Sequence, residues 1–178
     1  AEAKRQQVIS MLGRLAGLAE PPVAAAVTAG GPTEYRFRMD FDWGAGPGGR
    51  PVLGLLRAGC PAEILPIDRC LLMPEPADAI RKFTAERAQR LGLLAWDRKR
   101  RKGLLRRLGI QMAQTTGETL ATLETGRGDP PALAGLARDL VRAFPRVVGV
   151  VRREFDRLDR FVGESILCGR DHLFEEVD

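Results

Sequence analysis

One short segment alternates strictly between apolar and charged side chains, and this pattern constrains the fold more than any other feature of the chain. Its apolar positions are Tyr35, Phe37, Met39, Phe41 and Trp43, and its charged positions are Arg36, Arg38, Asp40 and Asp42. Because successive side chains of a strand point to opposite faces of a sheet, the segment predicts a strand with one buried face. The glycine-rich residues 44–49 and the apolar residues 51–57 then predict a turn and a returning strand, which makes an antiparallel hairpin.

The rest of the chain mixes helical and strand periods. Helical spacing of apolar residues predicts helices at 2–19, 76–95 and about 130–144. Alternation predicts a strand at 108–112, the turn at 115–118 predicts its hairpin partner at 119–125, and an apolar run predicts a strand at 147–151. After Arg160 we expect two short strands, interrupted at Gly163 and Gly169. Helices interleaved with hairpins, in place of strict strand–helix–strand units, predict an α+β domain with a mostly antiparallel sheet.

Breaker residues suggest where the chain divides. Pro21–Pro22 and Gly30–Gly31–Pro32 follow the first helix, so we expect an N-terminal helix and linker at 1–34 and the α+β domain at 35–178. No apolar run approaches the ~20 residues that a bilayer-spanning helix needs, and the N-terminal residues lack the apolar centre of a secretory signal. The expectation is therefore a cytoplasmic protein without membrane contact. Separately, we expect a monomer.

The cysteine and histidine content limits the chemistry of the chain. Its three cysteines, Cys60, Cys70 and Cys168, include no Cys-x-x-Cys pair, and His172 is the single histidine. This content disfavours a disulfide framework and a self-contained zinc site. It also nearly excludes a Ser–His–Asp or Cys–His catalytic arrangement.

Gly44-x-Gly46-x-x-Gly49 formally matches the dinucleotide-binding fingerprint. That fingerprint requires a helix to start at the glycines, because the phosphate binds the free N–H groups of a helix N-terminus. Here an extended segment follows, and Pro47 removes one donor. The motif therefore predicts a hairpin loop, and the sequence offers no S-adenosylmethionine site.

The charge of the chain favours an anionic partner. Its net charge is +5, and no acidic residue lies between Asp97 and Glu118. That interval holds the densest basic block: Arg98, Lys99, Arg100, Arg101 and Lys102, continued by Arg106 and Arg107. Such a block could neutralise several RNA phosphates, and we favour RNA contact over the alternative of a solvated loop. Arg36 and Arg38 could also pair with phosphates or stack on unpaired bases, or could simply form the solvent side of a strand.

Several segments, in this order, resemble one enzyme family. They are Tyr35-Arg36-Phe37-Arg38, Val52–Gly59, Ile64–Leu72 with its Ile67-Asp68-Arg69-Cys70, and the later Gly163-Glu164 and Leu167–Asp171. Together they resemble the central domain of the iron–sulfur type of RNA uracil-5-methyltransferases, which methylate C5 of uridine in ribosomal or transfer RNA. Such enzymes attack C6 of uracil with a cysteine and take the methyl group from S-adenosylmethionine.

The resemblance assigns roles that this chain would share with the rest of an enzyme. It implies no catalytic residue here, since the nucleophile, the base and the Rossmann-like cofactor domain are expected beyond residue 178. It implies that Cys70 is the last of four ligands of a [4Fe–4S] cluster, with the other three upstream of residue 1. Cys70 by itself would most often be a small buried apolar residue.

The expected function follows from these points. We expect the central segment of an S-adenosylmethionine-dependent RNA uridine C5-methyltransferase, which supports the cluster and orients structured RNA, ribosomal RNA rather than transfer RNA. In the family the Tyr-Arg-x-Arg run helps to hold the RNA side of the domain, although Phe37 departs from the usual polar third position. The alternative is a basic RNA-binding or assembly module without enzymatic activity.

Overall fold

The computed structural model describes residues 1–28, 30–46, 49–128 and 130–176. The chain divides into two compact units, Ala1–Pro32 and Thr33–Asp178, and each is described by itself.

The first unit is a helix followed by an extended segment. Helix α1 spans Glu2–Ala16 and ends where Gly17 adopts a left-handed conformation with φ 68°, three residues before the predicted end. The guanidinium of Arg5 donates to the carbonyl oxygens of Val23 and Ala24, at 3.1 and 3.2 Å, and so ties the extended segment back to the helix. Within this unit no residue of α1 is buried, so the extended segment leaves the predicted apolar stripe uncovered.

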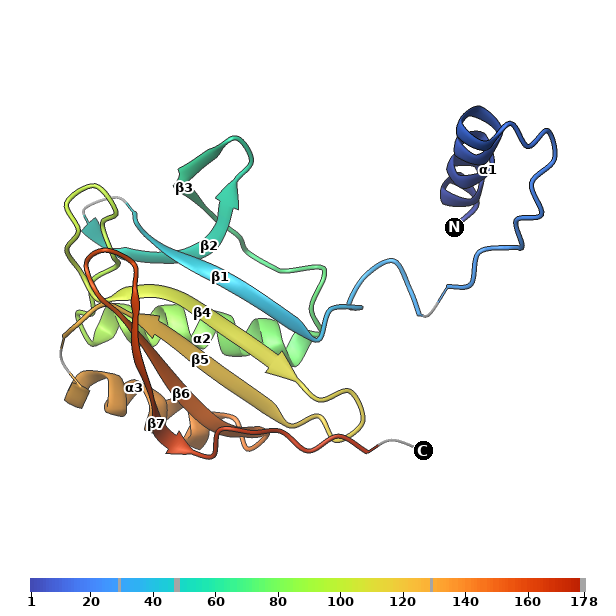
Figure 1. Ribbon diagram of the computed structural model, residues 1–178. Coiled ribbons are helices and arrows are strands. Elements are labelled where there is room, and N and C mark those ends of the chain that lie inside the picture. The colour runs from blue at the N-terminus through green and yellow to red at the C-terminus, as the bar shows by residue number, and fades with distance from the viewer. Residues whose placement is uncertain (29, 47–48, 129, 177–178) are drawn as a thin grey trace. The chain divides into compact units, whose positions relative to one another are not determined.

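The second unit is built on one seven-stranded sheet with two helices (Figure 1). The elements in chain order are β1 (Arg38–Ala45), β2 (Pro51–Arg57), β3 (Cys60–Pro66), α2 (Glu75–Arg90), β4 (Leu105–Met112), β5 (Thr119–Thr125), α3 (Pro130–Ala143), β6 (Val147–Phe155) and β7 (Phe161–Gly169). The strand order is β3-β2-β1-β4-β5-β6-β7. Every neighbouring pair is antiparallel except β5 and β6, which are parallel and are connected through α3. The predicted α+β fold with a mostly antiparallel sheet is confirmed.

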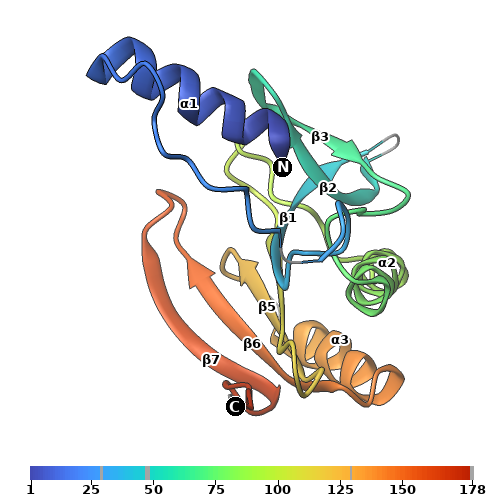
Figure 2. The ribbon, with the colours of Figure 1, turned by 90° about the vertical axis from the view of Figure 1, so that its right-hand side faces the viewer.

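Both helices lie on the same face of the sheet and cover the core (Figure 2). Fully buried side chains come from the strands and from both helices: Phe41, Leu108, Ile110, Leu123, Ile80, Leu133, Leu136 and Leu140. Phe83 of α2 and Phe144, which directly follows α3, form an edge-to-face pair with ring centroids 5.4 Å apart. An ion pair of Arg87 and Asp139 at 2.5 Å adds to this contact. The opposite face of the sheet carries charged side chains.

The alternation that predicted the first strand is confirmed from Arg38 onward. Met39, Phe41 and Trp43 are 8%, 0% and 4% exposed, which places them in the core. Tyr35–Phe37 precede the strand, since β1 begins only at Arg38. Asp42 departs from the alternation of buried and exposed residues. It lies on the charged face but is only 7% exposed, because arginine side chains cover it.

Three expectations were wrong in detail. The sequence analysis did not foresee β3, which pairs antiparallel with β2. Helix α2 ends at Arg90 instead of residue 95, because the chain turns at Gly92 with φ 66°. The C-terminal region forms the single strand β7, in which Gly163 pairs with Glu154, and Gly169 ends that strand with φ 69°.

The segment after β7 is fixed to the turn between β4 and β5. The carboxylate of Glu175 accepts the backbone N–H groups of Gln114 and Thr115, at 2.8 and 2.7 Å. The hydroxyl of Thr115 first, and then these N–H groups, lower the pKa of Glu175 below its usual range.

No helix in the described ranges has both the length and the hydropathy that a membrane span requires.

Candidate nucleic-acid interface

The loop before β4 carries most of the predicted basic block, and we call Arg98–Lys102 the basic loop. Asp97 organises it, since its Oδ1 accepts the backbone N–H groups of Lys99 and Arg100, both at 2.9 Å. Asp97 and Lys102 also form an isolated β-bridge that closes the loop. The backbone N–H of Arg100, helped by its guanidinium, lowers the pKa of Asp97 below the ordinary value of 3.8. Asp97 is therefore a charged cap that shapes the loop.

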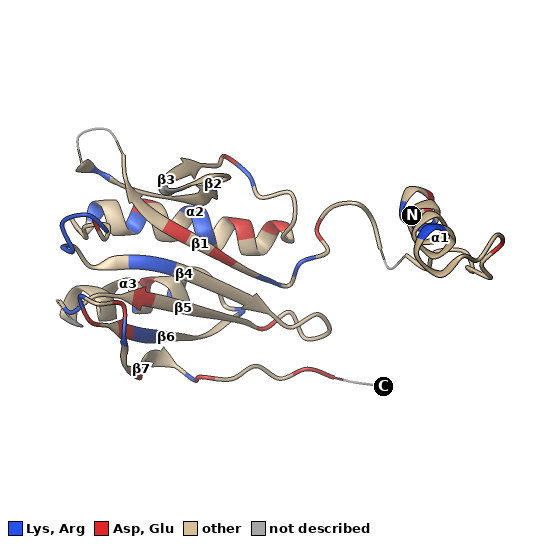
Figure 3. Cartoon of the chain, turned by 45° about the horizontal axis from the view of Figure 1, so that its top comes forward, with Lys and Arg blue, Asp and Glu red and all other residues tan. Residues whose placement is uncertain are grey.

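The cations of the basic loop differ in their partners. Arg98 pairs with Asp42 at 3.2 Å, and Arg100 pairs with Asp97 at 3.1 Å. Lys99, Arg101 and Lys102 make no ion pair with any other described residue. Figure 3 shows this loop as a nearly continuous basic stretch beside the start of β4. The three cations without an internal partner leave a net positive charge at this edge of the unit.

Arg106 and Arg107 follow the loop, but they lie in β4 and form ion pairs with other residues of the unit. A β-bulge between Leu105 and Arg107 places two consecutive arginines away from the core, while Leu105 and Leu108 are both fully buried. Arg107 pairs with Asp42 at 3.4 Å and with Glu124 at 3.7 Å. Its charge is thus compensated on the charged face of the sheet.

Arg106 connects β4 to the turn between β6 and β7. Its side chain is 11% exposed and forms an ion pair with Asp159. The guanidinium carbon lies 3.9 Å from the centroid of the Trp96 ring, and the guanidinium donates to the carbonyl oxygen of Asp156 at 2.7 Å. These contacts hold the turn and the tryptophan in fixed positions.

The turn at 156–160 is organised in the same way as the basic loop. Oδ1 of Asp156 accepts the backbone N–H groups of Leu158 and Arg160, at 2.8 and 3.0 Å. Its Oδ2 pairs with the Arg160 guanidinium at 2.8 Å. The backbone N–H of Arg160, followed by that guanidinium, lowers the pKa of Asp156. An aspartate therefore caps each of the two arginine-bearing loops.

These loops and the segment after β5 surround a cavity of about 660 Å³, which we call the three-loop pocket. Its basic side chains are Arg101, Lys102, Arg127, Arg157 and Arg160. Its apolar surface comes from Trp96, Phe155 and Leu158. The sequence analysis missed Arg127, Arg157 and Arg160, because each lies in a different turn from the basic block and only the sheet brings them together.

Glycines allow these loops to approach the tryptophan closely. Gly103 has φ 113°, and a Cβ atom there would lie 2.1 Å from the carbonyl oxygen of Ala95. A Cβ atom at Gly126 would lie 3.1 Å from the Trp96 ring. Larger residues at these positions would push the loops apart.

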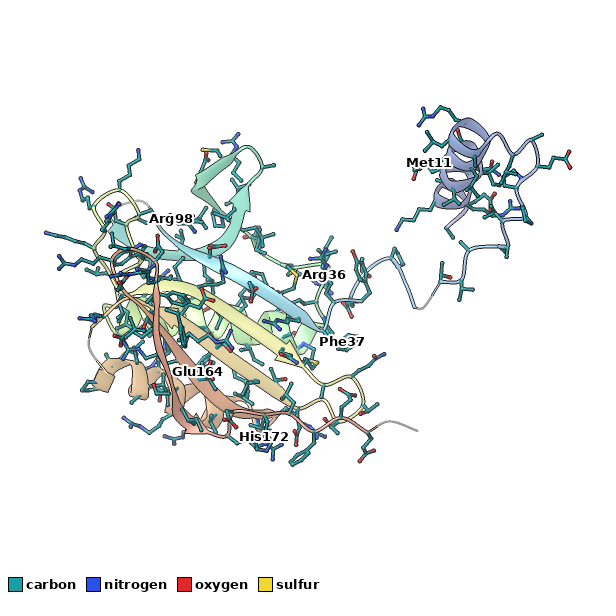
Figure 4. The ribbon with its side chains drawn as sticks, in the orientation of Figure 1. Met11, Arg36, Phe37, Arg98, Glu164 and His172 are labelled. Carbon is teal, nitrogen blue, oxygen red and sulfur yellow. The ribbon has the colours of Figure 1, made fainter. Side chains whose placement is uncertain are left out.

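Arg36 and Arg38 lie apart from the basic loop. Figure 4 shows Arg36 and Arg98 at opposite ends of the sheet. The register agrees, since Arg38 pairs with Gln111 while Asp42, the partner of Arg98, pairs with Arg107. The Arg36 guanidinium donates to the sulfur of Met39 at 3.4 Å, and both arginines are exposed. The structure thus divides the predicted RNA-binding residues between two ends of β1.

Cys70 lies in the core, where it is 4% exposed. Its backbone N–H donates to Oδ1 of Asp78 at 3.2 Å, and the same oxygen accepts the Arg81 guanidinium at 2.7 Å. Burial acts to raise the pKa of Asp78, but the hydrogen bonds from Arg81 and Cys70 outweigh it and hold that pKa below its usual value. Helix α2 therefore fixes the backbone of the Ile67–Cys70 segment.

The described residues do not fit a complete iron–sulfur cluster. No group of three or more His, Cys, Asp or Glu side chains gathers among them where a metal ion could bind. Cys60 is exposed in β3, and Cys168 is half-buried in β7. Cys70 is thus a single thiol that would need three ligands from elsewhere.

The glycine motif at 44–49 belongs to the β1–β2 hairpin, although Pro47 and Gly48 lie outside the described residues. A Cβ atom at Gly44 would lie 2.5 Å from Cγ1 of Ile64, so close packing against β3 explains this glycine. A strand follows the motif instead of the helix that a phosphate cradle needs. The motif therefore does not fit S-adenosylmethionine.

Sequence comparison finds relatives that are described as RNA methyltransferases. No family model matches the chain. An uncharacterized RNA methyltransferase of Gloeobacter violaceus is 29% identical over 99% of this chain and 39% of its own length. Another such protein, from Bacillus cereus, is 26% identical over 99% of this chain and 39% of its own length. The chain thus spans about two fifths of these curated relatives.

Structural comparison shows a shared fold. The crystal structure of the tRNA (uracil-54, C5)-methyltransferase of Pyrococcus abyssi in complex with S-adenosyl-L-homocysteine matches with a TM-score of 0.70 and 15% sequence identity. The match covers 99% of this chain and 41% of that protein, so the whole fold described above recurs there. The chain is therefore similar in sequence to part of proteins described as RNA methyltransferases, and it shares its fold with part of a tRNA methyltransferase.

Proposed function

We propose that this chain is the RNA-orienting segment of an S-adenosylmethionine-dependent methyltransferase that acts on C5 of uridine. The relatives named RNA methyltransferases and the shared fold support the enzyme class. The observation that carries the RNA role is the basic loop, in which Lys99, Arg101 and Lys102 have no internal ion-pair partner among the described residues. Cations at that edge suit the phosphates of an RNA backbone.

The share of this segment in the reaction would be geometric. Phosphate contacts position a nucleic acid without reading its sequence, and chemistry on a base requires that base to leave the stack. S-adenosylmethionine supplies the methyl group when it is bound. The segment described here would hold the RNA so that one uridine reaches the reacting groups, which are not among its residues.

The substrate in this proposal is structured RNA, with ribosomal RNA as the target. The Pyrococcus abyssi protein is described as acting on uracil 54 of tRNA, so transfer RNA is the alternative substrate to compare. Incubating the intact protein with S-adenosylmethionine and either RNA, then measuring 5-methyluridine by mass spectrometry, distinguishes the two. A methyl group on another atom or on neither RNA would contradict the proposed reaction.

The role of the basic loop has a matched test. In the intact protein, Lys99→Glu with Arg101→Glu should raise KM for RNA on the order of tenfold and change kcat little, because phosphate contacts are lost. Arg138→Glu with Arg142→Glu changes the charge equally on α3, where both arginines are exposed. An equal rise in KM for both pairs would reduce the effect to net charge and reject a specific role for the loop.

The ligand role of Cys70 stays part of the proposal only for an intact protein that supplies three further thiolates. Cys70→Ser should then lower the bound iron strongly, whereas Cys60→Ser, at an exposed position of β3, should leave it unchanged. Equal iron content in both variants would leave Cys70 as a core residue.

A further inference from the structure

We propose that the three-loop pocket binds one unpaired nucleotide of single-stranded RNA, a ligand class that rests on the proposed RNA partner. The phosphate would contact the cations of the pocket, and the base would pack on its apolar surface. The pocket combines three segments that are distant in sequence: the basic loop, the residues after β5 and the turn between β6 and β7.

The charge of the pocket favours an anion. Arg101, Lys102 and Arg157 line it and make no ion pair among the described residues. Asp156, the acidic residue of the lining, already accepts two backbone N–H groups and pairs with Arg160. The uncompensated charge is therefore positive and faces the cavity from two loops.

The apolar surface favours a base beside that anion. Trp96 and Phe155 are half-buried, and Leu158 is 58% exposed within the pocket lining. Bases of single-stranded RNA pack on such side chains, and arginine guanidinium planes can stack on them as well. The volume of about 660 Å³ lies in the range of small-ligand sites. A base-paired nucleotide would keep its base inside the helix, so the ligand must be unpaired.

The pocket is also held in shape before any ligand binds. Arg106 stacks on Trp96 and bonds the turn, while Asp97 and Asp156 cap the loops. Arg101 and Asp159 have left-handed backbones, with φ of 52° and 61°, and they are two of three described non-glycine residues with positive φ. Such strained positions concentrate at binding sites, where the surrounding structure maintains them.

Fluorescence of the intact protein tests the pocket directly when it is compared with that of a Trp96→Phe variant, because the difference isolates Trp96 from every other tryptophan. The chain has two tryptophans, and Trp43 is 4% exposed whereas Trp96 lines the pocket. A 12-nucleotide oligouridine should quench the emission, and Trp96→Phe should abolish that change. A duplex RNA of equal length, and inorganic phosphate, should leave the emission nearly unchanged. Equal quenching by the duplex would overturn the requirement for an unpaired base, and quenching by phosphate alone would reduce the site to an anion site.

Two substitutions separate the phosphate and base contacts. Arg157→Ala should weaken oligouridine binding roughly fivefold at 0.1 M salt and reduce the salt slope by about 0.7. Leu158→Ser should weaken binding about threefold at an unchanged slope, because only apolar contact is lost. Arg138→Ala on α3 is the control, and equal affinities for all three variants would overturn the inference.

The result of the oligouridine-binding experiments is independent of the methyltransferase assay. Methyl transfer to RNA with unchanged oligouridine binding by the pocket variants would reject the pocket and keep the proposed function. Pocket-dependent binding without methyl transfer to either RNA would keep the pocket and reject the proposed function.

Discussion

The basic loop and the start of β4 are neighbours in sequence, but their cations differ in whether they have ion-pair partners within the described part of the chain. Lys99, Arg101 and Lys102 make no ion pair among the described residues, whereas Arg106 and Arg107 are paired with Asp159, Asp42 and Glu124. The difference arises because β4 lies inside the sheet, where neighbouring strands and turns supply carboxylates, while the loop lies before the start of that strand. A dense run of cations in a sequence is therefore a poor guide to which of them can bind an external anion.

The strongest test of internal pairing uses a fully buried cation. Arg81 and Asp78 are each 3% exposed and lie 2.7 Å apart. Arg81→Ala should lower the free energy of unfolding by roughly 3–5 kcal/mol, because it leaves the buried carboxylate without its main partner. Urea denaturation measures this change. Lys82→Ala is the control, since Lys82 contacts the same carboxylate but is 51% exposed, and its cost should stay within about 1 kcal/mol.

Arg106→Ala applies the same test at the boundary with the loop. It removes the Asp159 pair, the bond to the Asp156 carbonyl and the contact with Trp96, so we expect a loss of about 2 kcal/mol. Lys99→Ala should change stability by less than about 0.5 kcal/mol. Similar losses for both variants would contradict the division between internal and external cations.

For RNA binding we expect the reverse order of effects, with a larger loss from a substitution in the basic loop than from one at an internally paired arginine. Arg101→Ala should reduce the salt slope of binding by about 0.7 and weaken affinity roughly fivefold at 0.1 M salt, since each lost phosphate contact removes one counterion-release contribution. Arg107→Ala should leave the slope unchanged, because its charge is directed to Asp42 and Glu124. A titration of affinity against salt concentration compares the two. A slope change for Arg107→Ala alone would reverse our assignment.

The smallest expected effect concerns the aspartates that cap the loops. Because the pKa values of Asp97 and Asp156 are lowered in the fold, the stabilisation that they supply is complete above the ordinary value of 3.8 and is lost as the pH falls below it. NMR titration of the Lys99 and Arg100 amides should therefore give a midpoint below 3.8. Asp97→Asn should abolish this transition, and a midpoint at or above 3.8 would contradict the capping role.

Much of the fold could be predicted because local pattern and tertiary environment agree. The alternation in β1 matches its buried and charged faces, and the hairpin of β4 and β5 follows its turn residues. The prediction failed where long-range pairing outweighed a local signal. Gly163 looked like a strand break, yet it lies within β7 opposite Glu154, and β3 carries a mixed sequence that becomes a strand by pairing with β2.

The candidate site was predictable only in part. The basic loop could be identified because its cations are consecutive, whereas Arg127 stands alone between two glycines and Arg157 lies in a mixed run of acidic and basic residues. The assignment of Arg106 to RNA contact stays a prediction, and its pair with Asp159 could not be foreseen because the two residues lie 53 positions apart along the chain. Whether Arg36 and Arg38 contact RNA stays a prediction, separate from the basic loop at the other end of β1.

The amino-acid sequence by itself determined the α+β architecture, the excess of positive charge and the position of the loop that carries it, because periodicity and composition act locally. Only the tertiary structure decided which cations are compensated and which surround a cavity. The physical reason is that an ion pair depends on distance in space, and the sheet brings carboxylates to β4 from strands and turns far away in the chain.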